Sequence, residues 1–261
     1  MKRVRKKTFY ALAAAWVIQT SAYADQTLEN LSTLLKERPI SITNELVVNT
    51  ENKVRYAAMI SEKQGIKDLF QKVYTSEFEE GYTYVKSFGA YVEIGKNEEN
   101  GKIYAGVEFE NNVIKKLYCT YGNLINTHIH PTRDVKKPEK ITSAIPRKQW
   151  DYLEMLPSFE DLTSYLILCK ELYKIKDGNI VDRIQSKFGI TEYSLTKKGK
   201  KYIEFLSNAE VAGYVAEKTN VLNNIFSNKI QPLERIVHTA SRILNDEYLK
   251  WEFIPYTELF N

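Results

Sequence analysis

The sequence predicts an α+β protein, an antiparallel sheet packed with helices, with a largely helical C-terminal extension. Three observations predict the α+β class. Apolar residues recur at helical spacing before residue 81, aromatic and β-branched residues alternate with polar ones through residues 81–130, and helical spacing returns after Ser158. Helices, then a run of strands, then helices is the order typical of α+β folds.

Residues 1–24 have the features of a secretory signal peptide. Five basic residues precede an apolar run from Phe9 to Ile18, and Ala22-Tyr23-Ala24 forms a small-x-small cleavage site. The apolar run is shorter than the roughly 20 residues that cross a bilayer. We therefore expect an exported protein, periplasmic or secreted, with no stable membrane anchor after cleavage.

The charge balance argues against nucleic acid as a partner. The signal region holds five of the 37 basic residues and none of the 33 acidic ones, so the remainder has 32 basic and 33 acidic residues. A net charge of −1 does not provide the basic surface that binding to phosphates requires.

The pattern along the chain predicts the domain organisation. Residues 25–53 are expected to form an N-terminal helical segment, with leucines at helical spacing. A domain over 54–178 would begin with a helix at 54–78, continue with four or five antiparallel strands, and contain an inserted loop at 132–157. Residues 179–261 are expected to be mostly helical, and "GITEYSLTKKGKKYIEFL" predicts a strand followed by a helix.

Two of the three histidines lie in "NLINTHIHPTRD", one residue apart. If this segment is a strand, His128 and His130 point to the same face and can bind one metal ion. Imidazole is a good ligand for Zn²⁺. The other interpretation is a partly exposed polar pair at a strand end, where Pro131 stops the ladder.

A third ligand is available downstream in "LPSFEDL". Ser158 and Asp161 have the spacing of a capping box before an apolar helix. A cap also holds Asp161 rigidly in the first helical turn, where its carboxylate could be a third zinc ligand and leave one position for water. The two interpretations are compatible.

The joint pattern of His-x-His-Pro followed by Pro-Ser-x-x-Asp resembles the JAMM (MPN-plus) zinc metalloproteases. The resemblance implies that His128, His130 and Asp161 bind zinc and that Ser158 stabilises the tetrahedral intermediate. It also implies that residues 54–178 form a JAMM/MPN-like catalytic domain, with a glutamate general base near the junction of a helix and the first strand. "SEFEEGYTY" offers Glu77, Glu79 and Glu80 there, and "EEGYTY" resembles an uncharacterised bacterial branch of the fold, which favours Glu79.

The function implied is a zinc-dependent hydrolase that cleaves a peptide or isopeptide bond in a protein or peptide substrate. The alternatives are a non-catalytic binding module on the same fold and a secreted toxin or effector that uses it. The sequence departs from the family pattern in the 26 residues, 132–157, between His-Pro and Ser-x-x-Asp. It also leaves open whether Cys119 and Cys169 form a disulfide or remain buried thiols.

Overall fold

The computed structural model describes residues 46–50, 53–76, 79–96, 111–131, 152, 154–175, 177–226 and 231–260. The expected signal peptide (1–24), most of the expected helical segment at 25–53, and nearly all of the inserted loop at 132–157 lie outside these residues. Among the helices that are described, none has the length and apolar character needed to cross a membrane.

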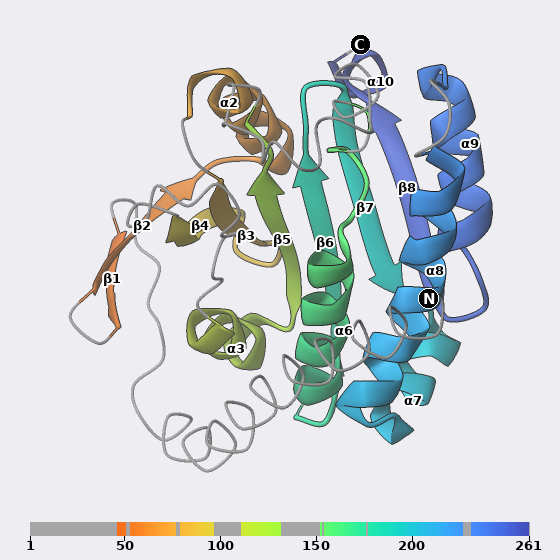
Figure 1. The fold of residues 1–261 in the computed structure, drawn as a ribbon. Helices are drawn as coiled ribbons and strands as arrows, with labels where there is room; N and C mark the ends of the chain where they lie inside the picture. Colours follow the sequence, from red (N-terminus) through yellow and green to blue (C-terminus); the bar gives the residue numbers. More distant parts are fainter. Residues whose placement is uncertain are drawn as a thin grey trace.

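The architecture is an eight-stranded mixed sheet with the order β1-β2-β4-β3-β5-β6-β7-β8 (Figure 1). Neighbouring strands are antiparallel except β5 and β6, which run parallel. The strands are β1 (Leu46–Thr50), β2 (Lys53–Met59), β3 (Glu80–Val85), β4 (Ala90–Lys96), β5 (Asn123–Ile129), β6 (Asn179–Gln185), β7 (Gly189–Leu195) and β8 (Leu249–Pro255).

The described helices lie on both faces of this sheet (Figure 1). They are α2 (Glu62–Thr75), α3 (Asn111–Tyr121), α6 (Phe159–Tyr173), α7 (Lys197–Phe205), α8 (Asn208–Phe226), α9 (Leu233–Leu244) and α10 (Tyr256–Phe260). The larger apolar core joins one sheet face to α3, α6, α7, α8 and α9. On the other face, Leu69 and Val73 of α2 pack against aromatic and β-branched side chains of β3, β4 and β5.

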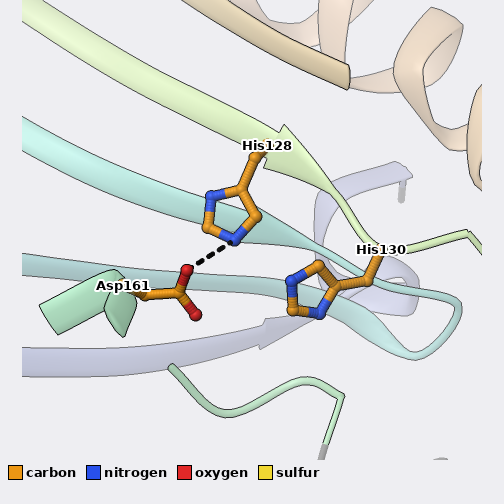
Figure 2. Close-up of side chains that lie close together, drawn as sticks. All are labelled: His128, His130 and Asp161. Atoms are coloured by element: carbon orange, nitrogen blue, oxygen red, sulfur yellow. Dashed lines mark ion pairs between the residues drawn. The ribbon is translucent and has the colours of Figure 1, made fainter. Parts of the chain in front are cut away.

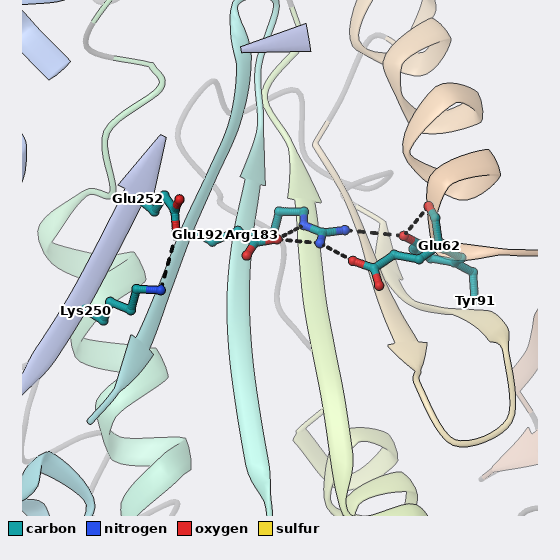
Figure 3. A network of polar contacts seen from close by, with 6 residues as sticks. All are labelled: Glu62, Tyr91, Arg183, Glu192, Lys250 and Glu252. Carbon is teal, nitrogen blue, oxygen red and sulfur yellow. Dashed lines mark hydrogen bonds and ion pairs between the residues drawn. The ribbon is translucent and has the colours of Figure 1, made fainter. Parts of the chain in front are cut away.

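Helix α2 is also fixed to the sheet by a buried charge network (Figure 3). Arg183 of β6 is 2% exposed. Its guanidinium donates to Glu62 in the first turn of α2 at 2.6 Å, to Glu192 of β7 at 2.8 Å, and to the Tyr91 hydroxyl of β4 at 3.4 Å. The carboxylates raise the pKa of Arg183 although burial opposes its charge. The network therefore ties the start of α2 to three strands.

The α+β class is confirmed, but four parts of the prediction need correction. The sheet is mixed rather than antiparallel, because β5 pairs in parallel with β6. Residues 111–121 form helix α3 where strands are expected, since Val113, Ile114, Leu117 and Tyr118 are buried at helical spacing.

The N-terminal prediction is also corrected. In the part of 25–53 that is described, β1 and the start of β2 stand where a helical segment is expected, and the two strands pair antiparallel. The helix expected over 54–78 forms in its later part as α2, while its first residues belong to β2. Helix α2 begins only at Glu62. Its N-cap is Ser61, whose hydroxyl accepts a hydrogen bond from the Gln64 amide at 3.2 Å.

The region 179–261 does contain the expected helices, including α7 directly after strand β7. It is not an extension apart from the sheet, however. Strands β6, β7 and β8 lie within it and continue the same sheet beyond β5. The helix predicted after Ser158 is α6, which begins at Phe159.

Candidate metal centre

Strand β5 carries His128, and His130 follows directly after the strand. His128 is paired with Gly81 of β3 on one side and with Ile184 of β6 on the other, and it is 3% exposed. The strand ends at Ile129, and the amide of His130 still donates to the carbonyl of Gln185 at 2.9 Å. The two imidazole rings therefore lie side by side, with centroids 4.9 Å apart.

Helix α6 supplies the carboxylate. Ser158 is the N-cap, and its hydroxyl accepts from the Asp161 amide at 3.0 Å. The Asp161 Oδ2 atom in turn accepts from the Ser158 amide at 2.7 Å, which completes the predicted capping box. Because Oδ2 is used in the cap, the other oxygen, Oδ1, is the one directed at His128.

The side chains of His128, His130 and Asp161 converge (Figure 2). One ligand atom from each lies within 4.8 Å of the others, an arrangement that could hold a metal ion. The Nε2 atom of His128 and Oδ1 of Asp161 are 3.6 Å apart. That separation is too long for a hydrogen bond and is close to the about 3.3 Å between two ligand atoms that each lie 2.0–2.1 Å from a tetrahedral zinc.

The tautomer of His130 follows from its contact with the segment before α6. The Nδ1 atom of His130 lies 2.5 Å from the carbonyl oxygen of Glu154. A carbonyl can only accept, so Nδ1 carries the proton and donates. In the neutral ring the lone pair is then on Nε2. Backbone carbonyls commonly orient metal-binding histidines in this way.

Burial and charge set the protonation of the three groups. Burial lowers the pKa of His128 to about 4, although Asp161 opposes that change. Burial acts in the same direction on His130, but the carboxylates of Glu79 and Asp161 outweigh it and raise its pKa. Burial would raise the pKa of Asp161, yet the two histidines and the Ser158 hydrogen bonds lower it. Near neutral pH, His128 is therefore neutral and Asp161 is ionised, the forms that bind metals.

The structure distinguishes between two of the three candidate glutamates, Glu79 and Glu80. The Oε1 atom of Glu79 lies 3.9 Å from Nε2 of His130, at the edge of the group. Glu80 points to α2 instead, where it accepts from Lys72 and Ser76. Glu77 lies outside the described residues. Of the glutamates that can be compared, Glu79 is the one beside the candidate metal ligands.

Three polar residues near the group were missed by sequence reasoning. The Glu154 carbonyl has no side-chain signature that could have revealed it. Asn126 lies two residues before His128 on the same face of β5, and Asp182 is its neighbour on β6. Both are buried, and the Asn126 amide donates to Asp182 at 2.9 Å. The sequence signal for Asp182 was the charged pair "DR" in the middle of the apolar strand "NIVDRIQ".

The cysteines remain thiols and do not form the disulfide considered from the sequence. Cys119 lies on α3, not on a strand as expected, and Cys169 is buried on α6. Burial raises the pKa of the Cys169 thiol to about 12, so it is protonated and unreactive at neutral pH.

Comparisons with protein-family models, with curated proteins and with solved structures find no match to this chain. The fold and the site therefore define the class: an α+β protein with a mixed sheet and a His-His-Asp group that could bind a metal ion.

Proposed function

We propose that this protein is a zinc-dependent hydrolase of JAMM type, which cleaves a peptide or isopeptide bond in a protein or peptide substrate outside the cytoplasm. The observation that supports it best is the convergence of His128, His130 and Asp161, with Glu79 3.9 Å from His130. Two imidazoles and one carboxylate form a donor set typical of catalytic zinc, which keeps an open coordination position.

The residues of the group would have different tasks. His128, His130 and Asp161 would hold the zinc, which when bound lowers the pKa of a coordinated water to about 7 and polarises the substrate carbonyl. The side chain of Glu79 is 33% exposed, so it can meet both solvent and substrate. In the proposed reaction it accepts a proton from the attacking water and passes it to the leaving amine.

Ser158 would act on the oxygen of the scissile carbonyl. Its hydroxyl accepts from the Asp161 amide, and the O–H proton of the same group can donate to an oxyanion. Ser158 is exposed at the start of α6, where the positive end of the helix dipole also favours a developing negative charge. The capping role and the proposed catalytic role use different atoms of one hydroxyl.

The test of catalysis is the variant Glu79→Gln, assayed with a panel of peptide and isopeptide substrates after zinc loading. The variant should keep its zinc and lose turnover, because it removes a proton acceptor and no ligand. The matched control is Glu160→Gln on the exposed first turn of α6, which should keep both. If Glu79→Gln turns over a confirmed substrate at the wild-type rate, the proposed mechanism is wrong. If the wild type binds zinc and hydrolyses nothing in the panel, the binding module is favoured.

A further inference from the structure

The carboxylate of Glu80 is bound to the end of helix α2. Glu80 is 5% exposed, and it accepts from Lys72 Nζ at 2.6 Å, from Ser76 Oγ at 2.8 Å, and from the Tyr82 hydroxyl. Lys72 is in the last turn of α2 and Ser76 is its C-cap. Burial would raise the pKa of Glu80, but the three donors outweigh it and lower the pKa. The group is therefore a carboxylate at neutral pH.

Glu79 and Glu80 are neighbours that point in opposite directions. Successive residues of an extended segment project to opposite faces of a sheet. Glu80 contacts α2 on one face, and Glu79 lies 3.9 Å from His130 on the other. Continuing the β3–β5 register from the Gly81–His128 pair by two residues places Glu79 opposite His130. Because the two residues are neighbours in one extended segment, the contacts that hold Glu80 also constrain the backbone from which Glu79 projects.

We propose that Glu80 is a positioning residue, which holds the junction between α2 and β3 so that Glu79 faces His130. The proposal about where Glu79 points rests on these contacts, and its importance for catalysis rests on the proposed function. A displacement on the order of 1 Å at a catalytic group can reduce a rate by about 10²-fold.

The negative charge of Glu80 is the feature that matters. A carboxylate has two oxygens and about four acceptor positions, whereas a glutamine amide has one acceptor oxygen and adds two donors. In Glu80→Gln the amide nitrogen would face at least one of Lys72, Ser76 and Tyr82, all of which donate in the wild type. A hydroxyl can reverse and accept from the amide, but the charge-assisted bond from Lys72 is weakened in either orientation. The hold on the junction is therefore loosened, although the side chain keeps its size.

The experiment measures the ring nitrogen-15 NMR signals of His130 in metal-free protein at one fixed pH, assigned with His130→Ala. Glu79→Gln should displace these signals, and Glu80→Gln should displace them in the same direction. The double variant should move them no further than Glu79→Gln alone, because Glu80 acts through Glu79. Ser76→Ala removes one donor and should give a smaller displacement, which keeps the test open if Glu80→Gln does not fold.

The matched control is Glu62→Gln, which weakens the attachment of α2 at its other end and should leave the His130 signals in place. The inference is overturned if Glu79→Gln moves the signals and both Glu80→Gln and Ser76→Ala do not. It is also overturned if Glu79→Gln itself moves nothing, or if the double variant exceeds Glu79→Gln.

Zinc binding by the wild type is measured in parallel, so that the two proposals can fail separately. The expected displacements without zinc binding support the position of Glu79 and contradict the proposed function. Zinc binding together with unchanged signals in Glu80→Gln and Ser76→Ala supports the proposed function and contradicts the positioning role of Glu80.

Discussion

Asp182 is a buried acid whose neutralisation should stabilise the protein above neutral pH. It lies on β6 and is 4% exposed. The Asn126 amide donates to its Oδ1 at 2.9 Å, and the Tyr193 hydroxyl donates to its Oδ2 at 3.4 Å. Burial raises its pKa to about 7, with a further contribution from the negative charge of Asp161, while the two hydrogen bonds act in the opposite direction.

The size of the effect follows from the difference between the folded and unfolded pKa values. A pKa of about 7 in the folded protein against about 3.9 in the unfolded chain corresponds to about 4 kcal/mol, at about 1.36 kcal/mol per pKa unit. Between these values the folded state binds more protons than the unfolded state. The contribution of Asp182 to stability is therefore fully present below about pH 4 and is lost as the pH rises through 7.

The variant Asp182→Asn removes the titration and keeps the shape. Its amide oxygen can still accept from Asn126, and its amide nitrogen can donate to the Tyr193 oxygen. In urea titrations with EDTA, the variant and the wild type should have similar free energies of unfolding near pH 4. Near pH 8 the variant should be more stable, by up to about 4 kcal/mol.

The matched control for this prediction is Asp177→Asn, which changes an exposed carboxyl just before the same strand. In this variant the free energy of unfolding should change between pH 4 and pH 8 as it does in the wild type. A wild type that is at least as stable as Asp182→Asn near pH 8 would refute the reasoning. So would a variant whose advantage is the same at both pH values.

The two other predictions concern Ser158 and the Arg183 network. Ser158→Ala should lower the free energy of unfolding by about 1 kcal/mol through the lost cap and, if Ser158 stabilises the oxyanion, should lower kcat by about 10²–10³-fold. Ser207→Ala, at the similar cap of α8, should show only the loss of stability. Equal turnover in the two variants would exclude the catalytic role. Glu192→Gln should lower the free energy of unfolding by about 3 kcal/mol, because it leaves a buried guanidinium with a weaker partner. Glu252→Gln, whose exposed ion pair with Lys250 is also drawn in Figure 3, should cost less than about 1 kcal/mol; similar losses in both variants would contradict the importance of burial.

The parts of the site that could be predicted from sequence are those that depend on short spacings. His128 and His130 are two residues apart on one strand, so a shared direction follows from strand geometry alone. The capping box between Ser158 and Asp161 is likewise a pattern of four residues, and it forms as expected. What the sequence could not supply is the distance between β5 and the start of α6, because the two elements are far apart in the sequence and meet only through the packing of α6 against the sheet.

The errors in the fold have a common physical cause. Residues 111–121 contain both β-branched and aromatic residues, and without tertiary context this local composition predicts strands. Burial of Ile114, Leu117 and Tyr118 against the sheet and α6 selects the helix. Similarly, "LVVNT" and "KVRYAAM" become strands because they can pair with each other and with β4. Neither pairing partner can be recognised from a window of ten residues.

Charged groups inside the core were the least predictable features. Asp182 and Arg183 are adjacent on β6 and point to opposite faces, so each needs its own set of partners. Those partners come from β4, β5, β7 and α2. A sequence read segment by segment shows the two charges but not the four elements that supply their partners.

The most direct test of the central claim is the zinc content of the purified protein. After gentle purification and resupply of zinc, the wild type should contain about one zinc per chain, because three protein ligands form one catalytic-type site. His128→Ala/His130→Ala should contain almost none, whereas His238→Ala, which removes an exposed histidine of α9, should match the wild type. A wild type without zinc, or a double variant that retains it, would contradict the proposed metal centre.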